Sequence, residues 1–244
     1  MKTALEGKTA VVTGVTSGIG EAITARLLDA GVSVLGIARD GAKLAALRVR
    51  WGDRFSSITV DLASPDERRQ ALVRAKALVP SADIVISNAA ECVYESPLAL
   101  DVDAFRRLLE VNVLTGIELI QGLAGAMPDG GHIVQLSSVT ARHLPSARFG
   151  PYATSKLTIE SFIESIRLEL HQRGIKVSLV VPGLVDTPIY DKVRGFEATR
   201  AKIREQVKEW LESDDVADAV LWMLTRPAHV VVSELVIMPR EQAR

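Results

Sequence analysis

The chain has 244 residues, a formal net charge of −1 and 48% apolar residues. This length fits one large α/β domain or two small ones and suffices for a sizeable core, while the apolar content excludes a disordered chain. The 29 basic and 30 acidic residues are interspersed, so neither a nucleic acid nor a lipid surface is expected as a partner.

Cysteine, histidine and apolar patterns narrow the class further. The single cysteine, Cys92, excludes an internal disulfide and is typical of a reducing compartment. The four histidines have no metal-ligand spacing, so no metal site is expected. The N-terminus has no signal-peptide pattern, and no apolar run approaches the ~20 residues of a membrane helix. We therefore expect a cytoplasmic protein without a membrane segment.

Short apolar runs alternate with longer helical patterns along the chain. The runs predict strands at 9–13, 32–38, 57–60, 83–87, 131–136, 175–181 and 230–238. The helical patterns cover 21–30, 41–50, 65–78, 102–123, 151–173, 199–211 and 214–225. This alternation predicts an α/β fold in one domain, with a doubly wound and mainly parallel sheet.

A glycine-rich turn follows the first predicted strand and precedes the first helix. Gly14, Gly18 and Gly20 have the spacing G-xxx-G-x-G. Glycines at this place let the backbone approach a pyrophosphate, and the helix N-terminus offers N–H donors to it. A tight connection without a ligand is the alternative interpretation.

The end of the second strand distinguishes the two nicotinamide cofactors. A carboxylate there binds the ribose 2′-hydroxyl of NAD, whereas an arginine suits the 2′-phosphate of NADP. The residues are Ala38 and Arg39, which favours NADP unless Arg39 is an ordinary solvated side chain. Asp61, after the third strand, is placed either to accept a hydrogen bond from adenine or to cap the next helix.

Tyr152 and Lys156 lie four residues apart on the longest predicted helix and therefore on one face of it. A free tyrosine has a pKa of about 10, and a fixed ammonium nearby lowers that value. The pair can then exchange a proton with a substrate oxygen. Taken alone, the same pair also fits a solvated helix surface.

Together, TGVTSGIG, Asn88-Ala89-Ala90, Asn112, Ser138 and YATSK resemble the classical short-chain dehydrogenase/reductase family over essentially the whole chain. The resemblance implies a single-domain Rossmann fold over residues 1–244, with a seven-stranded parallel sheet, in a homotetramer or homodimer. It implies an oxidoreductase that interconverts a ketone or aldehyde and an alcohol with NADP(H), NAD(H) being the alternative cofactor. The other interpretations are a C=N or C=C reductase and a non-catalytic nucleotide-binding regulator.

The resemblance also assigns the catalytic residues. Tyr152 is the acid/base, Lys156 lowers its pKa and holds the nicotinamide ribose, and Ser138 hydrogen-bonds the substrate oxygen. Asn112 orders a water behind the lysine. The spacing of 14 between Ser138 and Tyr152 is one longer than usual in the family, which leaves Ser137 as a competing candidate.

The remaining cofactor contacts follow from the same resemblance. They are Gly14, Thr16, Ser17, Gly18, Ile19, Gly20, Arg39, Asp61, Leu62, Asn88, Ala89, Tyr152, Lys156, Pro182, Gly183, Val185 and Thr187. Two departures from the family pattern matter. Ala90 replaces a glycine, so that turn must accept a Cβ, and Ser17 stands where many NADP-binding members carry a basic residue.

Substrate contacts are expected in the loops at the carboxyl ends of the strands. The candidates are Ser138, Val93, Tyr94, His143 and Tyr190. Arg142 and His143 either meet an anionic or polar substrate or form a solvated loop pair. The segment 186–212 combines a glycine, aromatic and charged residues, which is typical of a substrate lid. The substrate itself is a small carbonyl or alcohol compound.

Overall fold

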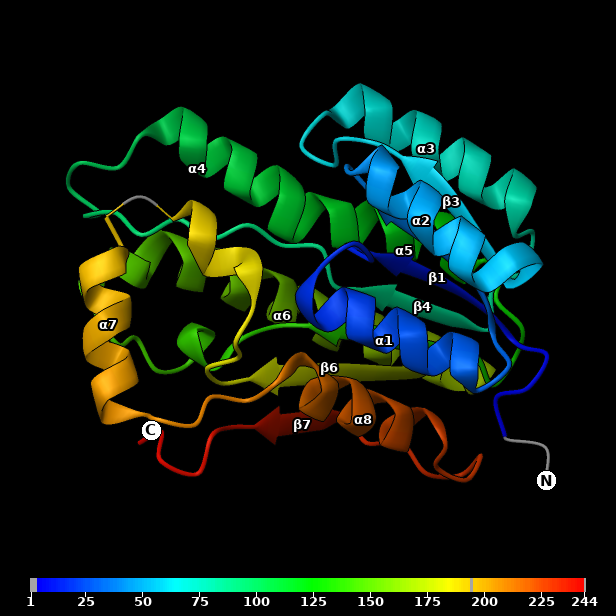
Figure 1. Cartoon of the computed structure of the whole chain (residues 1–244). Coiled ribbons are helices and arrows are strands. Elements are labelled where there is room, and N and C mark those ends of the chain that lie inside the picture. Colours follow the sequence, from blue (N-terminus) through cyan, green and yellow to red (C-terminus); the bar gives the residue numbers. More distant parts are fainter. Residues whose placement is uncertain (1–3, 194, 244) are drawn as a thin grey trace.

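One parallel sheet organises the computed structural model, which describes residues 4–193 and 195–243 (Figure 1). Its seven strands have the order β3-β2-β1-β4-β5-β6-β7. They are β1 (Thr9–Thr13), β2 (Ser33–Ala38), β3 (Phe55–Thr59), β4 (Ile84–Ser87), β5 (His132–Leu136), β6 (Lys176–Pro182) and β7 (Glu234–Ile237). The order reverses between β1 and β4, and a ligand crevice opens at such a point beyond the carboxyl ends of the strands.

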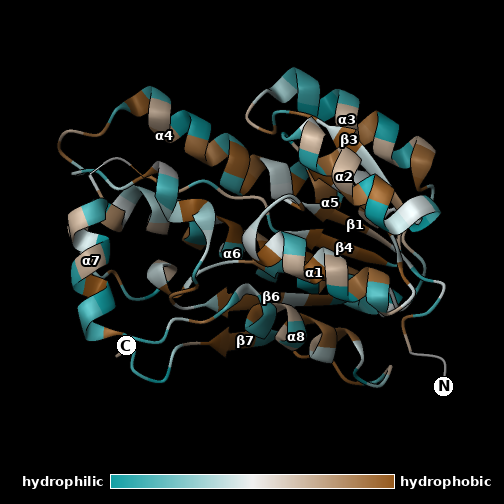
Figure 2. Ribbon diagram, in the orientation of Figure 1, coloured by the Kyte–Doolittle hydropathy of each residue, from teal (hydrophilic) through white to brown (hydrophobic). Residues whose placement is uncertain are grey.

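Helices cover both faces of this sheet. They are α1 (Gly18–Asp29), α2 (Gly41–Trp51), α3 (Pro65–Leu78), α4 (Val102–Leu109), α5 (Thr115–Ala124), α6 (Gly150–Leu170), α7 (Glu197–Gln206) and α8 (Ser213–Leu224). Apolar residues of α1, α2 and α8 form one core with Ala10 and Val12, while those of α3, α5 and α6 form the other with Val11. This alternation along β1 is what a strand buried on both faces requires, and Figure 2 shows the apolar strands between the two helix layers.

The predicted parallel α/β fold with seven strands is therefore confirmed. Boundaries differ most at the last strand, predicted over 230–238 and found at Glu234–Ile237, and at the helix predicted over 199–211, which ends at Gln206. Ser64 accepts a hydrogen bond from the Glu67 N–H and caps α3, so the helix-capping alternative for Asp61 is wrong.

The helix predicted over 102–123 contains a feature that its apolar pattern does not reveal. A π-helical turn, Glu110–Leu114, separates α4 from α5. Such turns insert one extra residue into a helix and are frequent at functional sites. Among the described helices, none is both long and apolar enough to cross a membrane.

Candidate active site

The glycine turn and the end of β4 are joined by close contacts. The Asn88 side chain donates to the Thr13 carbonyl at 3.0 Å, and Thr13 Oγ1 accepts from the backbone N–H groups of Asn88 and Ala89, both at 3.0 Å. A Cβ on Gly14 would lie 2.8 Å from Asn88 Nδ2, and one on Gly20 would overlap the Gly14 carbonyl. Glycine is therefore required at both positions, and the predicted departure at Ala90 is accepted without positive φ.

The N-terminus of α1 points out of this turn. Ser17 is its N-cap residue, yet its side chain makes no cap hydrogen bond, so the first-turn N–H groups are not taken by it. Gly18 has a φ of 55°, and a Cβ there would lie 3.2 Å from Thr187 Cγ2. The predicted contacts at Thr16, Ile19, Val185 and Thr187 thus belong to two loops that meet beside a free helix N-terminus. These residues fit a pyrophosphate-containing cofactor.

Lys156 lies on α6 and is almost completely buried, with an exposed fraction of 2%. Its Nζ donates to the Leu136 carbonyl at 3.1 Å and lies 5.8 Å from the centre of the Tyr152 ring. Burial lowers the pKa of Lys156 to about 8, although Cys92 and Glu160 act in the opposite direction. The ammonium form therefore still predominates at neutral pH.

The Tyr152 hydroxyl differs from the expectation. Its pKa is raised well above the usual value, chiefly by burial, and a hydrogen bond with Ser138 only partly offsets this. The prediction that Lys156 lowers the pKa of Tyr152 is therefore not supported. Tyr152 consequently keeps its proton at neutral pH and is available as a donor.

The two neighbouring serines have different partners. Ser137 is buried and donates to Glu160 Oε1 at 2.5 Å. Ser138 interacts with Tyr152, accepts from the Thr140 N–H at 3.2 Å, and begins a 3₁₀ turn, Val139–Ala141. Ser138 is thus hydrogen-bonded with Tyr152, and its catalytic role stays a prediction.

Asn112 lies in the π-helical turn and is 3% exposed. Its Oδ1 accepts from the Glu91 N–H at 2.8 Å, and its Nδ2 donates to the Glu91 carbonyl at 2.9 Å and to Ser155 Oγ at 3.0 Å. Ser155 in turn donates to the Tyr152 carbonyl at 2.7 Å. The Asn112 side chain therefore fixes the main chain after β4 to the catalytic helix, and its predicted water-ordering role remains a prediction.

A cavity of about 640 Å³ opens in front of Ser138 and Tyr152. Its other lining residues are Val139, Thr140, Arg142, His143, Leu144, Pro145, Phe149, Gly183, Leu184, Tyr190, Ile203, Gln206, Val207, Met238, Glu241, Gln242 and Ala243. His143 and Tyr190 thus lie at the cavity, as predicted substrate contacts should. Val93 and Tyr94 do not line it.

Tyr94 instead joins an aromatic cluster beneath the predicted lid. Its ring centre lies 4.9 Å from that of Phe149 and 5.2 Å from that of Phe196, and its hydroxyl lies 3.1 Å from Thr199 Oγ1. Cys92 packs against the same cluster, and burial raises the pKa of its thiol to about 12, so the thiol stays protonated. These contacts join Tyr94 and Phe149 to Phe196 and Thr199 of the segment predicted as a lid. Residue 194 of the segment 186–212 lies outside the described residues.

The C-terminal segment closes one side of the cavity. Gln242 Oε1 accepts from the Leu184 N–H at 2.8 Å, and Glu241 Oε2 accepts from the Lys208 N–H at 2.7 Å. The Gly183 N–H donates to the Ile237 carbonyl at 2.7 Å. The loop after β6 and the predicted lid are thereby both tied to the end of the chain.

Arg142 is not free to meet an anionic substrate. It binds Glu160 Oε2 at 3.2 Å and both carboxylate oxygens of Glu234, at 2.5 and 2.7 Å. The hydrogen bond to Glu234, assisted by Glu160, raises the already high pKa of Arg142 despite partial burial. Arg142 lines the cavity but is held by these two carboxylates, so its contact with a substrate stays a prediction.

The loops that end β2, β3 and β4 meet in a charged cluster, defined here as Arg39, Asp61, Glu91 and Arg107. Arg39 donates to Glu91 at 2.8 Å, and Arg107 donates to Glu91 and to Asp61 at 3.0 to 3.4 Å. Glu91 and Arg107 were not predicted as site residues, because nothing in their local sequence marks them. Lys43, also unpredicted, donates to the carbonyl of Thr16 at 3.2 Å.

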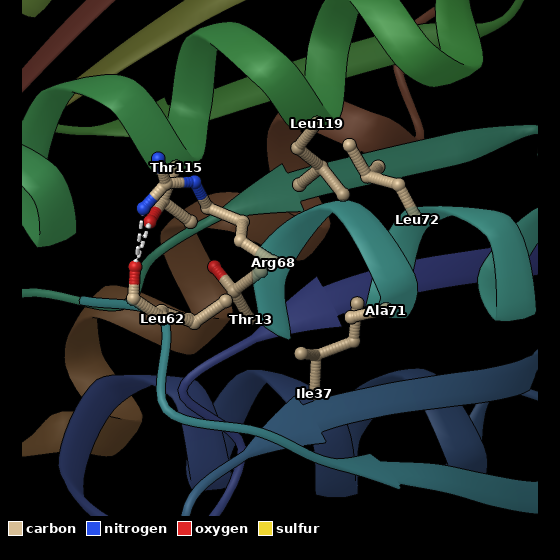
Figure 3. Close-up of a pocket in the computed structure, with 8 residues that line it drawn as sticks. All are labelled: Thr13, Ile37, Leu62, Arg68, Ala71, Leu72, Thr115 and Leu119. Carbon is tan, nitrogen blue, oxygen red and sulfur yellow. Dashed lines mark hydrogen bonds between the residues drawn. The ribbon is translucent and has the colours of Figure 1, made fainter. Parts of the chain in front are cut away.

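A buried arginine supports this region from below (Figure 3). Arg68 is 3% exposed, donates to the Leu62 carbonyl at 2.6 Å, and binds Glu110 and Glu118 at 2.7 to 2.9 Å. Thr115 Oγ1 also donates to the Leu62 carbonyl, at 3.4 Å. The void between these side chains measures only about 10 Å³, so this cluster positions the Asp61–Leu62 loop and is not a ligand site.

Comparison with known proteins agrees with this geometry. Residues 8–198 match the short chain dehydrogenase family. An uncharacterised oxidoreductase of Staphylococcus saprophyticus is 28% identical over 241 residues, which cover 96% of this chain and 98% of the relative. Among solved structures, the closed form of a serine dehydrogenase with NADP+ has a TM-score of 0.87 and 27% identity, covering 97% of this chain and 96% of that one.

A short chain dehydrogenase of Burkholderia cenocepacia, solved with NADP, has a TM-score of 0.84 and 30% identity, covering 96% of this chain and 97% of that one. A site built from a glycine turn and a Ser-Tyr-Lys set on a doubly wound parallel sheet defines a nicotinamide-dependent class of protein. The chain belongs to the short-chain dehydrogenase/reductase family of oxidoreductases.

Proposed function

We propose that the chain interconverts a ketone or aldehyde and the corresponding alcohol. The hydride passes between the substrate carbon and NADP(H). The observation that carries this proposal is the placement of Ser138 and Tyr152 on one cavity wall, with Lys156 buried behind the tyrosine. Bound NADP(H) would supply or accept the hydride. Residues of the glycine turn, Arg39, Lys156 and Thr187 would hold it.

The chain's own residues carry the proton. Ser138 and a protonated Tyr152 donate hydrogen bonds to the carbonyl oxygen, whose negative charge grows as the bond order falls. Donors aimed at that developing charge stabilise the transition state more than the ground state. Tyr152 then gives its proton to the oxygen, and the Lys156 ammonium stabilises the phenolate that remains.

NADP(H) is proposed over NAD(H) for two reasons. Arg39, not a carboxylate, directly follows β2, and the serine dehydrogenase and the Burkholderia cenocepacia relative were both solved with NADP. Lys43, bound to the glycine turn through Thr16, adds a second cation near the place where many family members carry one. Lys43 would thus supply the basic group that Ser17 does not provide.

The cavity suggests a neutral substrate. Apolar side chains of Phe149, Tyr190, Val207 and Met238 line much of it. A carboxylate recognised in such a place needs a cation, and Arg142 is already bound by two carboxylates, which leaves His143 among the described lining residues. We propose a neutral carbonyl compound in place of a small hydroxy acid, and we propose that the segment 186–212 closes over it.

The central test is the Tyr152→Phe variant. Its ring still fills the same space, so NADPH should bind with nearly unchanged affinity while turnover of a carbonyl substrate falls by at least ~10²-fold, the lower range for loss of a general acid. Dissociation constants would come from NADPH fluorescence titration and turnover from loss of NADPH absorbance. Undiminished kcat in this variant would refute the proposal.

The two serines provide a matched comparison. Ser138→Ala should lower kcat/KM by about 10²-fold, as expected for one oxyanion donor. Ser137→Ala removes a hydrogen bond to Glu160 away from the cavity and should act mainly on stability. Equal catalytic losses in the two variants would contradict the assignment.

Substrate screening separates the alternatives. A C=N or C=C reductase uses the same cofactor and is distinguished by a panel of ketones, aldehydes, imines and enones. A non-catalytic regulator would bind NADPH and turn over none of them. Including neutral and carboxylated ketones of equal size tests the substrate charge. We further propose that the chain is cytoplasmic. We also propose that it assembles as a homodimer or homotetramer, and analytical ultracentrifugation would measure this oligomeric state.

A further inference from the structure

We infer that Glu91 is a counter-ion of Arg39 that opposes the binding of the cofactor's 2′-phosphate to this arginine, so that Glu91 weakens the discrimination between NADP(H) and NAD(H). This inference rests on the proposed cofactor. It concerns a residue with no assigned role in catalysis or binding.

The Glu91 carboxylate is held firmly in place. Asn112 binds both the N–H and the carbonyl of Glu91, at 2.8 and 2.9 Å. Oε1 of Glu91 accepts from Arg39 Nη1 at 2.8 Å and from Arg107 Nη2 at 3.0 Å, while Oε2 accepts from Arg107 Nε at 3.1 Å. The Glu91 side chain is 25% exposed, compared with 47% for Arg39. A fixed and partly buried anion thus holds a more exposed cation.

The two arginines are not equivalent partners. Arg107 binds both oxygens of Glu91 and also pairs with Asp61, so it is anchored at two carboxylates. Arg39 makes one hydrogen bond to this cluster, to Glu91 Oε1. If Arg39 leaves, Glu91 keeps its charge-balancing contacts with Arg107. Exchange of Arg39 from Glu91 to a phosphate therefore breaks a single charge-assisted hydrogen bond.

The 2′-phosphate and Glu91 compete for the same guanidinium. A phosphomonoester carries a charge of about −1.5 to −2 near neutral pH, so it binds Arg39 more strongly than one carboxylate does. Lys43, which donates to Thr16, stands on the other side of the β2 loop and adds to the attraction. Glu91 opposes the attraction that Arg39 and Lys43 exert on the phosphate. It is bound to Arg39, and its negative charge repels the phosphate. NADH brings no phosphate to this place and is affected less.

The test is Glu91→Gln, which preserves the side-chain shape and the main-chain bonds to Asn112 while it removes the charge. Dissociation constants for NADPH and NADH would be measured by fluorescence titration at low ionic strength. We expect NADPH to bind about three- to fivefold more tightly, the range of a partly exposed ion pair, and NADH to change by less than about twofold. The gain should shrink in 0.5 M salt because screening weakens both partners.

Two further variants make the result specific. Asp53→Asn removes a carboxylate that pairs with Arg48 at 3.1 Å before the amino end of β3, whereas Arg39 follows the carboxyl end of β2, and it should leave both constants unchanged. In an Arg39→Ala background, Glu91→Gln should lose most of its effect on NADPH. Equal changes for the two cofactors, weaker NADPH binding, or the full gain without Arg39 would overturn the inference. If the unaltered protein binds neither cofactor, the proposed function itself fails.

Discussion

The pH dependence of cofactor capture should report the ionisation of Lys156. Burial lowers the pKa of this lysine from 10.5 to about 8, and with 2% exposure the side chain has little screening by solvent. That difference corresponds to about 3 kcal/mol against the ammonium form. At pH 7 roughly nine tenths of the protein should carry the charged lysine, and at pH 9 roughly one tenth should.

The sign follows from the role of the charge. In the proposed mechanism the ammonium binds ribose hydroxyls as a donor and stabilises a Tyr152 phenolate, so activity should be lost as pH rises through 8. We expect kcat/KM for NADPH to be level below about pH 7 and to fall about tenfold per pH unit well above 8. Burial raises the pKa of both Tyr152 and Cys92, so these two groups do not cause the fall in kcat/KM above pH 8.

Steady-state rates from pH 6 to 10, with one carbonyl substrate held at saturation, give this profile. Lys156→Arg supplies the comparison, because a guanidinium stays charged throughout this range. Its rate is expected to be lower at pH 7, and the limb near pH 8 should disappear. A wild-type profile that stays level to pH 9.5, or a limb that persists in Lys156→Arg, would refute the reasoning.

Two further predictions concern stability. Burial, assisted by Lys176, lowers the pKa of His132 from 6.5 to about 4. The unfolded chain therefore binds the proton more readily between these values, and the free energy of unfolding should fall by up to about 3 kcal/mol as pH drops from 6.5 to 4. Urea denaturation at pH 7 and 4.5 measures this change in the free energy of unfolding. The His132→Gln variant should show a smaller change between the two pH values, whereas His171→Gln, at an exposed position, should behave like the unaltered protein. Arg68→Leu should cost about 3 kcal/mol because it leaves Glu110 and Glu118 without their buried partner. Arg68→Lys should cost less, and a loss below about 1 kcal/mol in Arg68→Leu would show that the cluster adds little.

The parts of the site that the sequence predicts are local. Gly14, Gly18 and Gly20 precede a helix directly, and Tyr152 and Lys156 share one helical face, so spacing alone places each set. The seven strands were predictable for a similar reason. Strands buried on both faces appear as uninterrupted apolar runs between helical patterns. The resemblance already assigned Ser138, with Ser137 as the competing candidate. The structure adds that Ser137 is hydrogen-bonded to Glu160.

The parts that could not be predicted depend on side chains from distant elements. Arg107 lies 46 positions from Asp61, and Arg142 lies 92 positions from Glu234. Long charged side chains reach such partners only after the sheet has set the distances between loops. A solvated charge and a paired charge have the same appearance in a sequence, which is why Arg142 was a candidate for substrate binding and Glu91 was not considered.

Asn112 connects the two ends of the site in a way that neither motif reveals. Its side chain uses both donors and an acceptor on Glu91 and Ser155, and Ser155 holds the Tyr152 carbonyl. The π-helical turn places this amide between the loop after β4 and the catalytic helix. The main chain of Glu91 and α6, which carries Tyr152, are therefore linked by one buried side chain. The Asn112 side chain thus positions Glu91, the counter-ion proposed for Arg39, while its water-ordering role stays a prediction.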